Sequence, residues 1–253
     1  YLIRSEEHLT ESPKEMDNWV AAIELADSLG VDIASTSLGY AMFDTEEFTL
    51  SYADMDGQST RCSHAAQIAS RKGMLLVVAA GNEGNKDWHY ISAPADADSI
   101  LTVGAVDIFR NIADFSSFGP SADGRVKPEV CAVGKQTALI DPNNEWVINS
   151  NGTSFACPLL AGMAACLWSA LPNATNMEIR ERIIRSADRY TNPHEQYGYG
   201  IPDAWLAYTM HSTTHLSYGI TDEQKPKKIW KDGHIYILYN KNTYDLLGNK
   251  ISQ

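Results

Sequence analysis

A serine at the start of an apolar segment is the first feature of this sequence with chemical potential. Ser154 follows Gly152 and Thr153 and precedes a run of Ala, Leu and Cys that predicts a helix over about 154–170. A helix N-terminus offers unpaired N–H groups and a positive dipole, which suit a developing negative charge. Gly152 and Thr153 are small enough to let another chain approach, and Pro158 fits a first helical turn. The same pattern equally fits a buried helix capped by serine.

A second polar side chain, Asn82, follows an apolar strand expected at 74–80. Open α/β sheets build their sites at the carboxyl ends of the strands, which is where this residue would lie. Its side-chain amide can donate a hydrogen bond to an oxyanion. Considered alone, Asn82 is more simply explained as a turn residue, because asparagine tolerates the left-handed conformation.

The elements that must position these residues alternate along the chain. Helical spacing of apolar residues begins after Asp17, which is interpreted as an N-cap, and ends at Gly30. A capping box at Thr175-x-x-Glu178 starts a further helix. This alternation predicts an α/β fold with a mainly parallel central sheet flanked by helices. Another helix is expected at about 59–72, and strands at about 31–35, 100–106 and 126–132.

The character of the chain changes after about residue 210. Residues 212–224 are polar, and an alternating β pattern then surrounds the turn Asp232-Gly233, which is a strong hairpin signal. We therefore expect one main domain over 1–211 and a small β-hairpin tail over 212–253.

The overall composition excludes several functional classes. A net charge of −12 disfavours binding to a phosphate backbone, so no nucleic-acid partner is expected. No apolar run reaches the ~20 residues of a transmembrane helix, and no metal-ligand set is predicted. The four cysteines are interpreted as small buried hydrophobic residues. Cys157 and Cys166 would be ~13 Å apart on one helix, too far for a disulfide.

Together the two candidate segments resemble the subtilisin-like (subtilase) family of serine proteases. Gly152-Thr153-Ser154-x-Ala156-x-Pro158-x-x-Ala161-Gly162 is similar to the nucleophile motif of that family at every defined position. The other similar stretches occur in the family's order: Ser37-Leu38-Gly39, Ala80-Gly81-Asn82-Glu83-Gly84, Pro94 through Val103-Gly104-Ala105-Val106-Asp107, Phe115-Ser116-Ser117-Phe118-Gly119-Pro120, Asp123-Gly124-Arg125-Val126-Lys127-Pro128, and Tyr199-Gly200 with Asp203-Ala204. The resemblance covers residues 15–210 and implies a subtilisin-like fold.

The resemblance also implies a role for each matched residue. Ser154 would be the acylated nucleophile, and Asn82 would donate to the oxyanion together with the Ser154 N–H. Ser37, Leu38 and Gly39 would pair with an extended substrate. Ala80, Gly81 and Thr153 would line the substrate site, the first two around the side chain that precedes the scissile bond.

Two members of the expected catalytic triad have no counterpart in this sequence. The family carries an Asp-Thr/Ser-Gly turn and a His-Gly-Thr-His helix start, and neither occurs among these residues. His64, in a helix, and His89, in the loop after Asn82, are weaker substitutes and are better explained as surface residues. We therefore expect the domain to be incomplete at its N-terminus. The missing Asp and His would be supplied by a preceding segment or by a second chain of the same protein.

The resemblance implies a serine endopeptidase that is exported and acts on peptides or proteins. Calcium is common in such proteins, but no cofactor is assigned, and this chain carries no signal-peptide pattern. The tail from Lys228 to Gly248 resembles sorting segments of exported Bacteroidetes-type proteins as much as it suits a simple packed hairpin. An inactive binding protein on the same fold is the main alternative. An esterase ranks last, because Ser154 lacks the Gly-x-Ser-x-Gly context.

Overall fold

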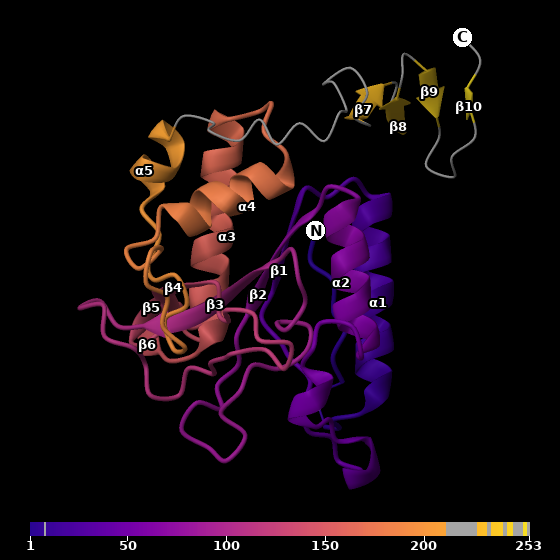
Figure 1. Cartoon of the computed structure of the whole chain (residues 1–253). Helices are drawn as coiled ribbons and strands as arrows, with labels where there is room; N and C mark the ends of the chain where they lie inside the picture. Colours follow the sequence, from indigo (N-terminus) through magenta and orange to yellow (C-terminus); the bar gives the residue numbers. More distant parts are fainter. Residues whose placement is uncertain (8, 211–226, 232–233, 240–241, 245–249, 252–253) are drawn as a thin grey trace.

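The centre of the molecule is one parallel β-sheet. The computed structural model describes all residues except 8, 211–226, 232–233, 240–241, 245–249 and 252–253. Within them, the sheet has the order β1-β2-β3-β4, so each strand pairs with the next one along the chain (Figure 1). The strands are β1 (Ile33–Thr36), β2 (Leu75–Ala79), β3 (Leu101–Val106) and β4 (Val130–Val133). The predicted α/β class with a parallel sheet is confirmed.

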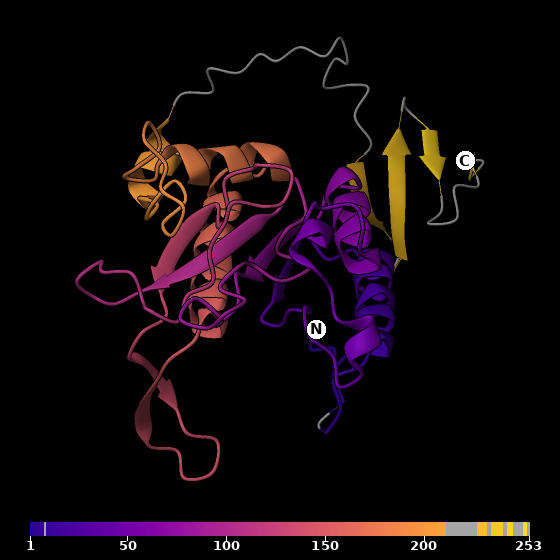
Figure 2. The same ribbon diagram turned by 60° about the horizontal axis from the view of Figure 1, so that its bottom comes forward.

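Helices cover both faces of this sheet, as Figures 1 and 2 show. On one side lie α1 (Pro13–Ser28) and α2 (Arg61–Arg71), which pack against each other. On the other side α3 (Thr153–Ala170) contacts all four strands and is flanked by α4 (Asn176–Arg185) and α5 (Ala204–Thr209). By length and composition α3 could also cross a membrane, but here it is the core helix of this layer.

The apolar run of β2 follows from this layered arrangement. Successive side chains of a strand point to opposite faces. Leu76 and Val78 therefore join the core against α1 and α2, whereas Leu75 and Val77 join the core beneath α3. Since both faces are buried, no polar residue interrupts the strand.

Two element boundaries differ from the sequence-based expectation. Helix α1 begins at Pro13 rather than after Asp17, because Ser12 and Glu15 form a capping box and Pro13 occupies the first turn. Strand β4 begins at Val130 rather than near 126, because Pro128 has no N–H for the ladder. The capping box of α4 at Thr175 is confirmed.

Several short elements were not predicted. A separate antiparallel hairpin is formed by β5 (Thr137–Ile140) and β6 (Val147–Ser150), just before α3. Helix α5 is capped by Asp203. Two 3₁₀ turns, Glu46–Phe48 and Tyr52–Asp54, lie in the segment expected to be a loop.

The tail forms a second, antiparallel sheet. Its strands are β7 (Lys227–Lys231), β8 (His234–Tyr239), β9 (Asn242–Tyr244) and β10 (Lys250–Ile251), in the order β10-β9-β8-β7. The predicted hairpin is confirmed by the β7–β8 pairing, while the turn at 232–233 and the expected boundary near 211 lie outside the described residues. Ile235 of β8 lies against Gly30, where a Cβ atom would not fit.

The cysteines are all free, and three of them are buried. Cys166 is exposed on α3, so its interpretation as a buried hydrophobic residue was wrong. The helical spacing placed it opposite the sheet-facing residues Ala164 and Leu167, a difference that the apolar composition alone did not reveal.

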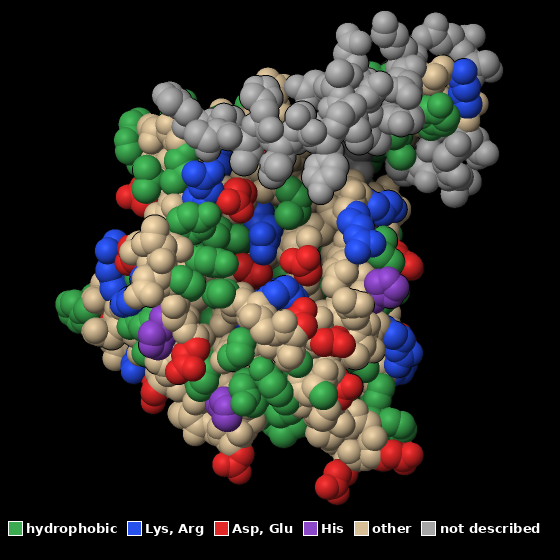
Figure 3. Space-filling view, viewed as in Figure 1, with side chains coloured by type: hydrophobic (Ala, Val, Ile, Leu, Met, Phe, Trp, Pro, Cys, Tyr) green, Lys and Arg blue, Asp and Glu red, His purple; other side chains and the backbone are tan. Residues whose placement is uncertain are grey.

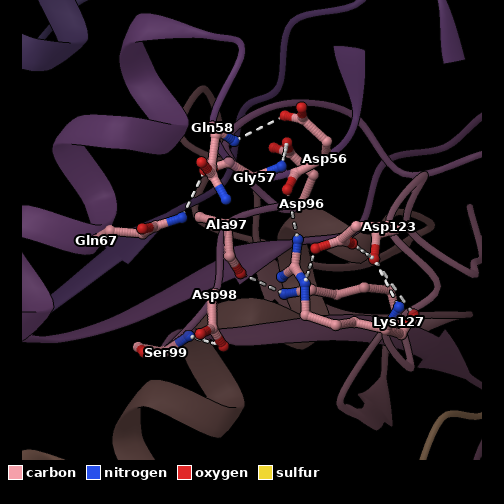
Figure 4. Close-up of polar contacts among 12 residues, drawn as sticks. Asp56, Gly57, Gln58, Gln67, Asp96, Ala97, Asp98, Ser99, Asp123 and Lys127 are labelled. Carbon is pink, nitrogen blue, oxygen red and sulfur yellow. Dashed lines mark hydrogen bonds and ion pairs between the residues drawn. The ribbon is translucent and has the colours of Figure 1, made fainter. Parts of the chain in front are cut away.

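A buried network of charged and polar groups joins the loops behind β3 and β4 (Figure 4). The Lys127 Nζ, which is fully buried, donates to Ala97 O at 2.7 Å and lies 2.9 Å from Glu129 Oε1. Asp96 accepts hydrogen bonds from the Gly57 N–H at 2.7 Å and from the Ser63 hydroxyl at 2.5 Å. These contacts fix the positions of segments that are far apart in the sequence.

Candidate active site

The carboxyl ends of β1 and β2 meet the N-terminus of α3 and bring together three residues predicted to act. The Ser154 hydroxyl donates to the Ser37 carbonyl oxygen at 3.3 Å, and the Ser37 hydroxyl donates to the Ser154 carbonyl oxygen at 3.0 Å. Asn82 reaches the same helix end, because its Oδ1 accepts the Thr153 N–H at 2.9 Å. The structure therefore assembles Ser37, Asn82 and Ser154 at one edge of the sheet.

The orientation of the Asn82 side chain follows from its partner. A backbone N–H can only donate, so the atom that faces Thr153 must be the carbonyl oxygen Oδ1. The NH₂ group consequently points the other way, and no acceptor for it exists among the described residues. Asn82 is exposed, so this NH₂ group is available to a ligand.

Thr153 and Gly81 lock this orientation from beneath. The buried Thr153 hydroxyl accepts the Gly81 N–H at 3.2 Å and lies 3.1 Å from Asn82 Oδ1. Gly81 has φ 110°, and a Cβ atom there would lie 2.8 Å from the Ser117 hydroxyl. Only glycine satisfies both the backbone conformation and this close approach.

Pro158 lies inside α3 rather than in its first turn, as the sequence analysis had it. Because proline has no N–H, the carbonyl oxygen of Ser154 loses its helical hydrogen bond. That oxygen accepts the Ser37 hydroxyl instead. The proline thus turns a helical carbonyl into an anchor for the segment that follows β1.

The Ser154 N–H is a free donor at the start of the helix. It has no acceptor among the described residues, as is usual for the first N–H groups of a helix. Together with the Asn82 NH₂ group, it provides two donors at the positively charged end of the α3 dipole. This arrangement can stabilise an oxyanion.

The segment Ser37–Gly39 continues beyond the last paired residue of β1. Ser37 and Gly39 are exposed, and Leu38 packs partly into the core on the α1–α2 side. The segment ends where Tyr40 and Ala93 exchange backbone hydrogen bonds of 2.7 and 3.0 Å. No backbone N–H of Ser37–Gly39 has an acceptor in the described part of the chain, so this edge is open to an added strand.

Ala80 has a different setting from the other predicted site residues. It is fully buried, and its side chain belongs to the core on the α1–α2 side. Its N–H donates to Val103 O at 3.0 Å, which extends the pairing of β2 and β3. It supports Gly81 and Asn82 rather than presenting a surface of its own.

Two residues beside the site had no predicted role. The Ser117 hydroxyl accepts the Glu83 N–H at 3.0 Å, and the Ser117 N–H donates to Gly81 O at 3.0 Å, so Ser117 holds the turn around Asn82. The Cys157 thiol lies 3.2 Å from Val77 O and 3.4 Å from Thr36 O, and burial raises the pKa of this thiol. The serine belongs to a stretch that the family resemblance had marked, which was the available signal.

No described histidine or carboxylate hydrogen-bonds to Ser154. His64 is exposed on α2. His89 Nδ1 lies 3.0 Å from Asp87 O, and the His89 ring stacks on Phe118. Within the described residues, the structure therefore brings the nucleophile and the oxyanion donors together without a general base.

The described residues also contain no group of three or more His, Cys, Asp or Glu side chains placed to hold a metal ion. On the face shown in Figure 3, acidic and basic side chains are interspersed, and Lys and Arg form no continuous patch. Neither observation adds a cofactor or a charged ligand to the site.

Comparison with known proteins identifies a consistent set of relatives. Residues 8–200 match the family model described as the subtilase family. Subtilisin DY from Bacillus licheniformis is 34% identical over 182 residues, which are 72% of this chain and 57% of that protein. A thermophilic serine proteinase from Bacillus sp. (strain AK1) is 33% identical over 178 residues, which are 70% of this chain and 41% of that protein.

Solved structures agree with the sequence matches. The prenylagaramide maturation protease PagA superimposes with a TM-score of 0.62 at 25% identity, over 80% of this chain and 69% of that one. The chain spans 57% and 41% of the lengths of the two relatives named above.

Proposed function

The chain belongs to the subtilase family, and from this premise we propose that it provides the nucleophile and the oxyanion site of a serine endopeptidase. The observation that carries this proposal is the contact between Asn82 Oδ1 and the Thr153 N–H at 2.9 Å. It leaves the Asn82 NH₂ group and the Ser154 N–H as two free donors at one helix end.

In the proposed reaction, Ser154 Oγ attacks the carbonyl carbon of a peptide bond. A general base takes the hydroxyl proton, and the carbonyl oxygen becomes an oxyanion held by Asn82 and the Ser154 N–H. The C–N bond then breaks, and the amine leaves with the proton returned by the base. Water hydrolyses the acyl-enzyme in a second passage through the same site.

The substrate is proposed to bind as an extended strand along Ser37–Gly39. The free backbone groups of this segment support main-chain pairing, which is a common mode of peptide recognition. Gly81 and Thr153 would shape the pocket beside the scissile bond, with Ala80 supporting them.

The general base and its carboxylate are proposed to come from a segment outside the described residues, either on the same polypeptide or on a second chain of the same protein. Two features support this proposal. The outer edge of β1 has no described partner strand. In addition, α3 leaves a stripe of small and apolar residues exposed, which another segment could cover: Pro158, Leu159, Gly162, Ala165 and Cys166.

Export is proposed on the basis of relatives. One of them, from Natrialba magadii, is described as an extracellular serine protease and is 34% identical over 137 residues. The alternative function is an inactive binding protein on the same fold, and the absence of a described base at Ser154 favours it.

The test is covalent labelling of the complete protein with a fluorophosphonate probe, followed by peptide mapping. We expect the label on Ser154 and its loss in Ser154→Ala. Addition of the probe to this chain alone should give much slower labelling, because no base activates the hydroxyl. A complete, folded protein that is not labelled at Ser154 would favour the binding alternative.

A further inference from the structure

The β5–β6 hairpin exposes an unusual amount of apolar surface. The exposed fractions are 73% for Trp146, 73% for Val147, 67% for Ile140 and 39% for Ile148. We call these four residues the apolar hairpin patch. Figure 2 shows the hairpin projecting from the body of the molecule at the lower left. A large exposed apolar cluster on a soluble protein marks an interaction site.

The position of the hairpin links the patch to the nucleophile. Strand β6 ends at Ser150, and the chain then passes through Asn151 and Gly152 into the helix of Ser154. The Gly152 N–H donates to Gly134 O at 2.8 Å, so both ends of the hairpin are held beside the helix start. Its connection is to β4, whereas the Ser37–Gly39 segment extends β1, the opposite edge strand of the sheet.

The distribution of apolar residues over the hairpin indicates how a partner binds. Ile140 and Val147 are directly opposite each other and share one face. Trp146 and Ile148 flank Val147 in sequence and so point to the other face. A partner docked on one face would leave the other face exposed, whereas a strand added to the edge would place side chains beside both.

The hairpin has a free edge for such an addition. It is a two-stranded sheet, so β6 has no described partner on its outer side. An isolated two-stranded hairpin is only marginally stable, and a third strand would stabilise it. The occupant is therefore an extended peptide segment with apolar side chains.

We propose that β6 binds the part of the polypeptide substrate that follows the scissile bond, as an added strand whose alternating side chains are apolar. This inference rests on the proposed function, because it assigns to the substrate a continuous path from Ser37–Gly39 past Ser154 to β6. Four residues of β6 span ~13 Å, so the contact covers about four residues of substrate.

The test measures binding of two fluorescein-labelled peptides to this chain by fluorescence anisotropy. The peptides share the residues before the scissile bond and differ after it, with four alternating Val and Leu residues in one and four Ser and Asn residues in the other. The variant is Trp146→Ser combined with Val147→Ser. The matched control is Trp205→Ser on α5, because Trp205 is 71% exposed but lies at the other end of α3 (Figure 1).

We expect the double variant to bind the apolar peptide roughly tenfold more weakly, as for the loss of an aromatic contact residue. The Trp205→Ser control should bind it as the unmodified chain does, and the polar peptide should bind all three proteins equally weakly. An unchanged affinity of the double variant, or an equal loss in the control, overturns the proposal.

Hydrogen exchange provides a second readout that does not depend on a substitution. Binding of the apolar peptide should protect the β6 amides at Val147–Asn149, and unchanged exchange there overturns strand addition. If the double variant instead abolishes a dimer seen by sedimentation, the occupant is a second copy and the proposal is wrong. Failure of the proposed function is separate, because it appears as absent labelling of Ser154 in the complete protein whatever the hairpin binds.

Discussion

Replacing Thr153 by valine tests whether the hydroxyl of this residue holds the oxyanion site together. Valine keeps the shape of the side chain and removes one donor and acceptor. The hydroxyl accepts the Gly81 N–H at 3.2 Å and donates towards Asn82 Oδ1 at 3.1 Å. Asn82 Oδ1 retains the Thr153 N–H at 2.9 Å, but Gly81 loses its acceptor.

The expected loss of stability can be worked from these contacts. One hydrogen bond contributes about 1 kcal/mol net, and a backbone N–H left without a partner costs a further ~1–2 kcal/mol. Thr153 is fully buried, so water does not replace the hydroxyl. We expect Thr153→Val to lower the free energy of unfolding by about 2–3 kcal/mol and Thr153→Ser to lower it by less than about 1 kcal/mol.

The assay is urea denaturation followed by tryptophan fluorescence, together with turnover of a peptide substrate by the complete protein. Because Asn82 loses one of two contacts that orient its NH₂ group, we expect kcat to fall while KM changes little. The reasoning is refuted if valine and serine are equally destabilising, or if Thr153→Val raises KM and leaves kcat unchanged.

Three other outcomes follow from buried groups. Lys127→Met should lower the free energy of unfolding by about 3 kcal/mol, measured in urea, because Glu129 loses a buried partner. Burial raises the pKa of Asp96, so the stability from this group is complete below its unfolded pKa and is lost as the pH rises through its folded pKa. Asp96→Asn should therefore flatten that part of a plot of urea midpoint against pH, and an unchanged slope would contradict it. Finally, iodoacetamide should alkylate Cys166 rapidly and the three buried thiols only after urea is added, as read by mass spectrometry; rapid alkylation of a buried thiol would contradict the structure.

The sheet was predictable because burial on two faces leaves a clear trace in a sequence. The apolar run of β2 has no polar interruption, since its side chains enter both cores. The start of α1 was missed for the opposite reason. The analysis followed apolar spacing from Asp17, whereas the helix is started by the polar capping box of Ser12 and Glu15.

The site could be predicted in its residues but not in its geometry. The motifs around Ser154 and Asn82 indicated a nucleophile and an oxyanion donor. The orientation of the Asn82 amide depends on a contact between residues 71 positions apart, which no local pattern encodes. The role of Pro158 was also hidden, because its missing N–H matters only once the Ser37 hydroxyl lies beside Ser154.

The contact of α3 with all four strands has a consequence for the order in which the molecule is made. A ribosome releases the chain from its N-terminus, at roughly 5–20 residues per second. Ser37 is synthesised 117 residues before Ser154, so the segment beside β1 exists for several seconds before its partner emerges. The nucleophile helix can seat only when the four strands are present to receive it. A reactive serine is thus assembled from the newest part of the domain onto the oldest, and the nascent chain carries no finished oxyanion site while most of its peptide bonds are still unprotected.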